Sequence, residues 1–177
     1  EQSLIIGFTV NGSKDLVVRG VGPALASAGV TAPLADPRLA VRDAAGRLIA
    51  QNDNWEDGAG AKYWIQETGL PLANFSKDAG YMGPFPAGGC TMQIDSAGGA
   101  DGVALGEVSE TKIFSLVAKL TNLSARAFVG AGENIAIAGF VLQGAGRARL
   151  LVRAVGPGLA EFGVAGVLAN PVMVLTD

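Results

Sequence analysis

Histidine is absent from this chain, and cysteine occurs only once. Without an imidazole, the chain cannot form a His-based catalytic triad or a His-ligated zinc site. Cys90 has no second cysteine for an internal disulfide and no imidazole base to activate its thiol. We therefore expect Cys90, which stands in the strand-like stretch GGCTMQID, to be a buried, inert thiol.

Charge is also scarce, because only 16% of the 177 residues are charged and the net charge is −3. Nucleic acids and anionic membranes attract clusters of Lys and Arg, and the sequence has none, so we expect neither as a partner. Apolar runs such as LIIGF and IAIAGFVL are too short to span a bilayer, so we expect no membrane insertion. The apolar fraction of 49% is enough for a sizeable core.

Glycine is plentiful, with 26 residues, and it recurs in turns between short apolar segments. Short strands at regular spacing predict an all-β fold, a jelly-roll-like β-sandwich. The best helix candidate is Ala61–Thr68, which Gly69 would end. The predicted strands are Leu4–Val10, Leu16–Arg19, a hairpin over 37–51, a pair formed by 85–96 and 101–110, two or three strands over 115–142, and one at 148–155.

The most informative feature is an internal repeat. Residues 16–43 align without a gap to residues 150–177, at an offset of 134, and fourteen of the 28 positions are identical. Upstream, EQSLIIGFTV at 1–10 matches ENIAIAGFVL at 133–142. The offsets differ within a turn, a length change that a duplicated hairpin tolerates. The identical positions are Leu16, Val18, Arg19, Val21, Gly22, Pro23, Leu25, Ala26, Gly29, Val30, Leu34, Ala35, Pro37 and Asp43.

The repeat indicates that the chain starts inside one module and ends inside the next. We expect residues 1–110 to form a first β-sandwich repeat that lacks its opening strands. Residues 111–177 would form the opening part of a second repeat, packing on the first or on a neighbouring subunit. In the second repeat IAIAGFVL follows LTNLSARAFVGAG and should pair with it. LIIGFTV has no such predecessor, so we expect it to be an open sheet edge.

The repeated phrase, RGVGP at 19–23 and RAVGP at 153–157, has the outline of a dinucleotide-binding loop. That interpretation needs an uninterrupted helix after the loop, and Gly29, Pro33 and Pro37 interrupt it. A tight Gly-Pro corner at a strand end, followed by a short helical turn, fits better. We expect Arg19 and Arg153 to close on a carboxylate or on turn carbonyls, and the two phrases to occupy equivalent places in two related sheets.

The acidic stretch DAAGRLIAQNDNWEDGAG offers candidates for a ligand site. Asp43, Asp53 and Asp57 could bind Ca²⁺ through carboxylate oxygens, although the spacing is not that of an EF-hand and Asx residues form turns unaided. Trp55 and Trp64 could stack on a sugar ring, although Trp is more often a core residue. A carboxylate pair such as Asp53 and Asp57 could hydrolyse glycosides, but nothing suggests a cleft around it. We expect no other cofactor, no catalytic residue and no enzyme activity.

Several stretches of the chain together resemble a known family. They are the run from LTNLSARAFVGAGENIAIAGFVL through RAVGPGLAEFGV to VLANP, the phrase NDNW, and the closing PAGGCTMQID and DGVALGEVSE. This family is a repeated β-rich module of large secreted or surface proteins of environmental bacteria. Tyr tends to occupy the place of Cys90 there. The tail also looks similar to prepeptidase C-terminal-type β-sandwich domains. The resemblance implies a bacterial, extracellular and non-catalytic module, and it brings no ligand with it.

Two functional hypotheses follow. The first is an extracellular or cell-surface structural module that assembles head to tail with itself, into a filament or a tandem surface array, by strand complementation. The alternative is a carbohydrate- or calcium-binding accessory module of a secreted enzyme or adhesin, with polysaccharide as its partner. In the first hypothesis the apolar residues of the two terminal strands form the assembly interface: Leu4, Ile6, Phe8, Val10, Val172 and Val174.

Overall fold

The computed structural model describes residues 3–58, 60–63, 69, 71–111, 118–132, 134–142 and 145–176. The chain divides into two compact units, 1–128 and 129–177. The strands are β1 (Leu4–Asn11), β2 (Lys14–Val21), β3 (Pro37–Asp43), β4 (Leu48–Asn52), β5 (Ala79–Phe85), β6 (Gly88–Ser96), β7 (Leu105–Glu110) and β8 (Lys119–Arg126); the 3₁₀ helices are η1 (Pro23–Ala28), η2 (Trp55–Asp57) and η3 (Pro157–Phe162).

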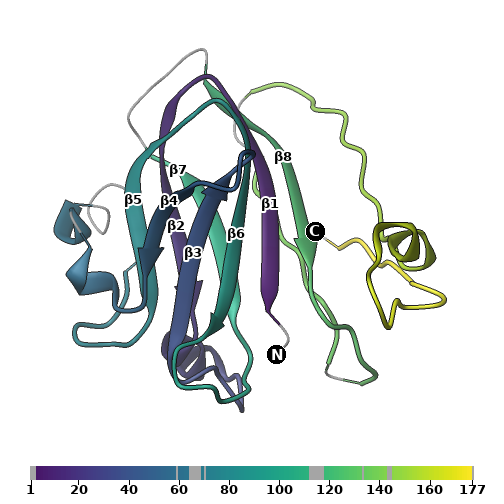
Figure 1. The fold of residues 1–177 in the computed structure, drawn as a ribbon, viewed down its shortest axis with the longest axis horizontal. Coiled ribbons are helices and arrows are strands. Elements are labelled where there is room, and N and C mark those ends of the chain that lie inside the picture. Colours follow the sequence, from purple (N-terminus) through teal and green to yellow (C-terminus); the bar gives the residue numbers. More distant parts are fainter. Residues whose placement is uncertain are drawn as a thin grey trace. The chain divides into compact units, whose positions relative to one another are not determined.

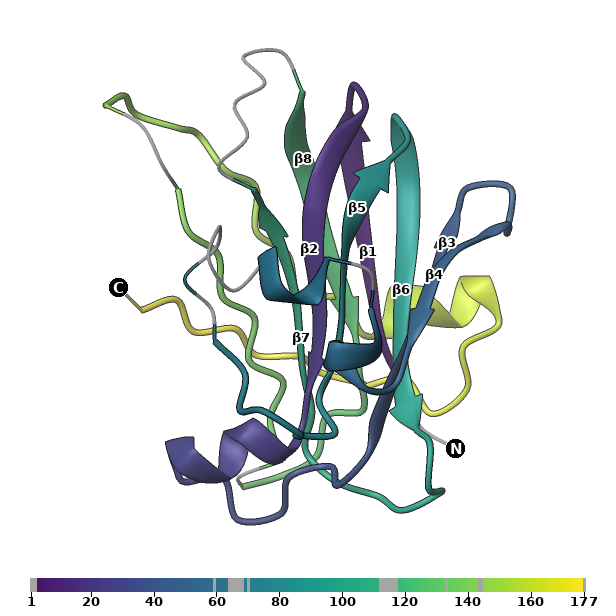
Figure 2. The same ribbon diagram turned by 90° about the vertical axis from the view of Figure 1, so that its left-hand side faces the viewer.

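The first unit is a sandwich of two antiparallel sheets (Figures 1 and 2). One sheet, which we call sheet A, has the order β4-β3-β6-β1-β8, and sheet B has the order β5-β2-β7. Apart from the β3–β4 hairpin, consecutive strands alternate between the two sheets, as in a jelly roll. The predicted all-β sandwich is therefore confirmed.

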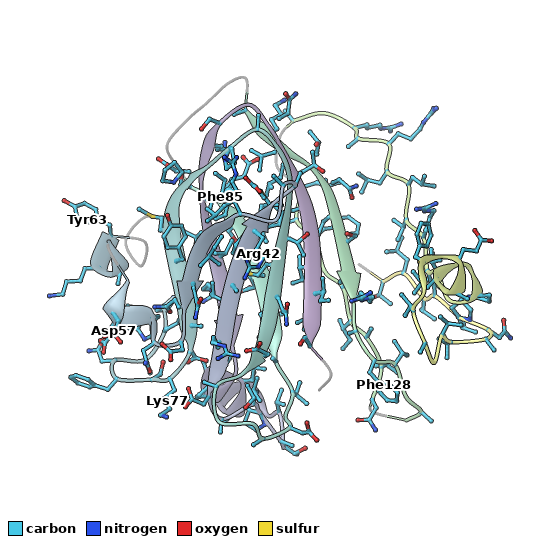
Figure 3. All side chains as sticks on the ribbon, in the orientation of Figure 1. Arg42, Asp57, Tyr63, Lys77, Phe85 and Phe128 are labelled. Atoms are coloured by element: carbon cyan, nitrogen blue, oxygen red, sulfur yellow. The ribbon has the colours of Figure 1, made fainter. Side chains whose placement is uncertain are left out.

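The core lies between the sheets because apolar residues alternate along the strands. Ile6, Phe8 and Val10 of β1 point inward and are buried. The ring of Phe85, on β5, meets the ring of Phe8 edge to face, with 5.8 Å between the ring centres. Figure 3 shows Phe85 among the strands of the sandwich.

Strand β2 is buried on both faces, which explains why its valines and leucine occupy both inward and outward positions instead of alternating with polar residues. Leu16 and Val18 belong to the core between the sheets. Val17 and Val21 point the other way, into a second apolar cluster that covers the outer face of sheet B. That cluster also contains Trp55, Ala61 and Leu72, with Met82 packed against it.

Several local predictions are confirmed. The Gly-Pro corner leads into η1, and Gly29 ends this helix with a φ of 86°. The hairpin expected over 37–51 is formed by β3 and β4. Residues 61–63 are helical as predicted, and the rest of that predicted helix, 64–68, lies outside the described residues.

The long-range pairing differs from the prediction in two ways. The predicted strands over 85–96 and 101–110 form as β6 and β7, but they lie in different sheets and do not pair with each other. Likewise β1 and β2 follow one another without forming a hairpin, because the turn between them carries the chain from sheet A to sheet B. Strand β5 was not predicted, because it contains Gly80, Gly83 and Pro84, and glycine and proline are unfavourable inside strands.

The second unit corrects the prediction of further strands. Its described residues, 129–132, 134–142 and 145–176, contain η3 and no strand, so neither IAIAGFVL nor the stretch 148–155 is in a sheet. The phrase RGVGP therefore ends a sheet strand, whereas RAVGP does not. The physical reason is that a strand needs hydrogen-bonding neighbours, and this unit contains none of the segments that flank β1 and β2.

No helix in the described part of the chain is long and apolar enough to span a bilayer.

Candidate functional site: the joint between the two repeats

Strand β1 is not an open sheet edge, because β8 pairs with it on one side and β6 on the other. In the β1–β8 register, Ile6 lies opposite Ala125 and Phe8 opposite Leu123. In Figure 1, β8 runs beside β1 at the end of sheet A. The expected role of Leu4, Ile6, Phe8 and Val10 as an exposed edge is therefore wrong: Leu4 packs against the core and the other three are buried in it.

The sequence predicts that β8 belongs to the second repeat, because LTNLSAR precedes the copy of β1. By structure, it completes the first repeat, and the compact unit ends after Phe128 rather than at residue 110. The predicted pairing of this strand with IAIAGFVL is replaced by pairing with β1. With β8 assigned to the second repeat as the sequence predicts, sheet A is the joint between the two repeats, because β8 pairs there with β1 of the first.

A buried lysine fastens the start of β8. The Lys14 ammonium, at the start of β2, donates to the Ala118 carbonyl at 3.1 Å and forms an ion pair of 3.0 Å with Glu110. The Glu110 carboxylate also accepts a hydrogen bond of 2.8 Å from the Leu120 N–H. Hydrogen bonds to charged groups are the stronger kind, especially where one partner is buried. We call Lys14, Glu110, Ala118 and Leu120 the β8 clasp.

Beyond its first residues β8 buries few side chains. Leu120 packs against the core, but Leu123, which shares the inward face, is 51% exposed. The five-stranded sheet A is wider than the three-stranded sheet B, and the edge strand β8 is little covered by it. β8 is therefore attached mainly by its backbone ladder to β1 and by the clasp, which is the kind of contact that strand exchange uses.

The two phrases that carry the family resemblance meet at Asp78, whose side chain is fully buried. One carboxylate oxygen accepts hydrogen bonds from the N–H groups of Gly22 (2.8 Å) and Ala24 (3.3 Å), which belong to the RGVGP corner. The other accepts one from the Ser76 hydroxyl. In the NDNW phrase, the backbone N–H of Trp55 donates a hydrogen bond to the backbone carbonyl of Asp78 at 2.8 Å. The phrases therefore serve the architecture of the corner.

The expectation for Arg19 is confirmed and that for Arg153 is not. Arg19 is buried and forms an ion pair with Glu107 of β7, next to β2. Arg153, at the equivalent place of the second repeat, is exposed. Sequence analysis did not single out Asp78, Glu107, Lys14 or Glu110. An Asp just before an apolar segment and an acidic residue in GEVSE were the available signals, but a single sequence does not show which cation or N–H they face.

The structure does not bring Asp43, Asp53 and Asp57 together as one calcium site. Asp43 lies at the turn of the β3–β4 hairpin and Asp53 follows its open end, so β4 separates them by about 13 Å, whereas calcium ligands lie about 2.5 Å from the ion. Asp43 instead binds the Arg47 guanidinium and the Ala45 and Arg47 N–H groups. Among the described residues, no group of three or more His, Cys, Asp or Glu could hold a metal ion.

Trp55 does not offer a sugar-binding platform, because its ring is buried and its indole N–H donates to the Ala73 carbonyl at 3.1 Å. Trp64 lies outside the described residues. Figure 3 shows Asp57 and Tyr63 away from the strands, at the periphery of the first unit. At the far end of the chain, Val172 and Val174 are exposed and lie in no strand.

No protein-family model matches this chain, and comparisons with curated proteins and with solved structures found no significant match.

Proposed function

We propose that this chain is a non-catalytic, extracellular structural module that assembles head to tail, into a filament or a tandem surface array, by strand complementation. Each module receives the opening strand of the next repeat at the edge of β1 that β8 occupies in this chain. The observation that carries the proposal is the position of β8, which precedes the second copy of β1 in sequence and pairs with the first copy in space. The extracellular, bacterial location in this proposal is what the resemblance of the sequence to secreted bacterial modules implies.

The β8 strand suits this role for energetic reasons. Without it, β1 would expose a row of unpaired N–H and C=O groups, which is a template for association. The ladder with β8 pairs these groups and the clasp holds the start of β8, while few apolar side chains of β8 are buried. Exchanging one copy of β8 for another therefore costs little. A contact between two different surfaces also propagates, because each module donates one strand and accepts one.

Cysteine cross-linking can test this contact. Gly7 and Ser124 are directly opposed on β1 and β8, and a Cβ at Gly7 would lie 2.7 Å from the Ser124 hydroxyl oxygen. We expect the double variant Gly7→Cys with Ser124→Cys to form a disulfide under mild oxidation, because opposed residues of antiparallel strands lie within disulfide reach. A Gly7→Cys variant that also carries Ser27→Cys, an exposed position on η1, is the matched control.

Exchange between chains is tested by mixing the two single variants, Gly7→Cys and Ser124→Cys. We expect disulfide-linked pairs whose yield rises with protein concentration, together with larger species in sedimentation. If the double variant cross-links only within one chain, the mixed variants never do, and the protein stays monomeric at high concentration, then filament assembly from separate chains is wrong. If the double variant does not cross-link at all, the joint itself is wrong.

A further inference from the structure

The second repeat carries a finished copy of the corner that ends β2. In both corners the glycine lies equally close to a backbone carbonyl. A Cβ on Gly22 would lie 2.0 Å from the Leu34 carbonyl oxygen, and a Cβ on Gly156 would lie 2.0 Å from the Leu168 carbonyl oxygen. Three hydrogen bonds recur at matching positions, with lengths of 2.9, 3.1 and 3.2 Å in the first corner and 3.0, 3.0 and 3.3 Å in the second. They join Leu25 to Gly22, Gly29 to Ala26 and Val30 to Leu25, and correspondingly Leu159 to Gly156, Gly163 to Ala160 and Val164 to Leu159.

In the first repeat the corner and its strand have their partners in one stretch of chain, residues 78–110. β5 and β7 flank β2 on its two edges. Glu107 pairs with Arg19, and the Asp78 carboxylate accepts the corner N–H groups of Gly22 and Ala24. β6, from the same stretch, pairs with β1. This stretch is therefore the counterpart against which residues 1–43 fold.

The second repeat presents the same groups without that counterpart. In the described residues 145–176, Leu151 is 86% exposed where its equivalent Val17 is 1% exposed. Arg153 is exposed, and the N–H groups of Gly156 and Gly158 stand where Asp78 caps the first corner. An exposed apolar segment is unfavourable in water, and both an exposed cation and the N–H groups of such a corner favour carboxylate partners.

The partner is not a second intact copy of this chain. In every copy, the strands β5, β6 and β7 already hold that copy's own β1 and β2. Binding there would displace one set of strands for another with no gain in burial.

We propose that residues 133–177 are the opening half of a second sandwich, and that their partner is an unoccupied segment of the 44–110 type. This partner supplies four strands, equivalent to β4, β5, β6 and β7. It also supplies one carboxylate at the place of Asp78 for the N–H groups of Gly156 and Gly158, and one at the place of Glu107 for Arg153. The inference rests on the proposed function, because a completed second sandwich would follow the first in a row of modules that are linked by shared strands.

The test lengthens the full chain by a second copy of residues 44–110 placed after Asp177. We expect the amides of 135–142 and 150–155 to become protected from hydrogen exchange, and the unfolding enthalpy to rise. Arg153→Gln, or Asp78→Asn in the added copy only, should lower the melting temperature of the new module. The matched control is Arg153→Gln in the chain without the added copy, where we expect no shift in melting temperature.

Three outcomes would overturn this inference. The first is a lengthened chain in which these amides stay unprotected while the first module remains folded. The second is protection of the same amides in the original chain as it oligomerises, which would make a second copy the partner. The third is protection that neither Arg153→Gln nor Asp78→Asn in the added copy weakens, which would show that the proposed carboxylate contacts do not form. Disulfide formation between Gly7→Cys and Ser124→Cys, measured in the same lengthened chain, reports the joint separately, so the failure of one proposal is distinguishable from that of the other.

Discussion

Cys90 and Asp43 lie opposite each other where β6 meets β3, and the surroundings shift the pKa of both side chains. Burial raises the pKa of the Cys90 thiol, and the neighbouring Asp43 charge raises it further. The thiol is therefore protonated at neutral pH and poorly nucleophilic, as the sequence predicted. It belongs to the core between the sheets.

Asp43 makes stability depend on pH. The Arg47 backbone N–H, its guanidinium and the Ala45 N–H hold the pKa of Asp43 below its usual value of 3.8. A carboxyl whose pKa is lowered by folding stabilises the fold above its unfolded pKa, and this contribution disappears as the pH falls through the folded pKa. We predict that Asp43→Asn lowers the melting temperature at neutral pH and that the difference from the parent shrinks below about pH 4.

Thermal melts across this pH range measure the effect, with Asp101→Asn, at an exposed position, as the control. A difference between Asp43→Asn and the parent that stayed constant down to strongly acid pH would show that the carboxylate charge is not the cause.

At the scale of the element, the Gly-Pro corner decides how β2 leaves sheet B. A Cβ at Gly22 would lie 2.0 Å from the Leu34 carbonyl oxygen, and backbone atoms cannot move aside as a flexible side chain can. We predict that Gly22→Ala lowers the free energy of unfolding by about 3 kcal/mol, in the upper range for overpacking. Urea denaturation of the first unit measures it.

The control for this prediction is Gly98→Ala, where an added Cβ would meet nothing within 4 Å. Gly156→Ala provides a second comparison, since its clash with Leu168 is the same but lies in the second unit. We expect neither variant to change the urea midpoint of the first unit. An equal loss in Gly22→Ala and Gly98→Ala would contradict the close-approach explanation.

At the scale of the whole molecule, the two units should differ in resistance to proteolysis. The first has a closed core and paired strands, whereas the described residues of the second expose Ile137, Val141 and Leu151 and form no ladder. Local opening is easiest where few backbone hydrogen bonds and buried contacts oppose it. We predict that brief proteolysis of dilute protein removes residues beyond about 128 and leaves β1 to β8 intact.

Mass spectrometry of the fragments identifies the cleavage sites. Cleavage within β2 or β6 at the same rate as within 134–151 would contradict the prediction.

Some features were determined by the sequence itself. Alternating apolar residues gave the strand character of β1 and β3, because side chains on a strand point to opposite faces. The Gly-Pro corners and the ending of η1 at Gly29 were also predictable, because these conformations depend on neighbouring residues alone. The repeat was visible in the same way, and it predicted two like corners.

The tertiary structure alone decided which strand pairs with which. β8 could pair with either copy of β1, and the sequence placed it next to the second. It pairs with the first, because β6 already fixes β1 in a sheet whose other edge is open, whereas the second copy has no sheet to join among the described residues. The partners of Asp78 and Arg19 were hidden for the same reason. Contacts between residues far apart in the chain depend on the packing of whole sheets, and local patterns carry no record of it.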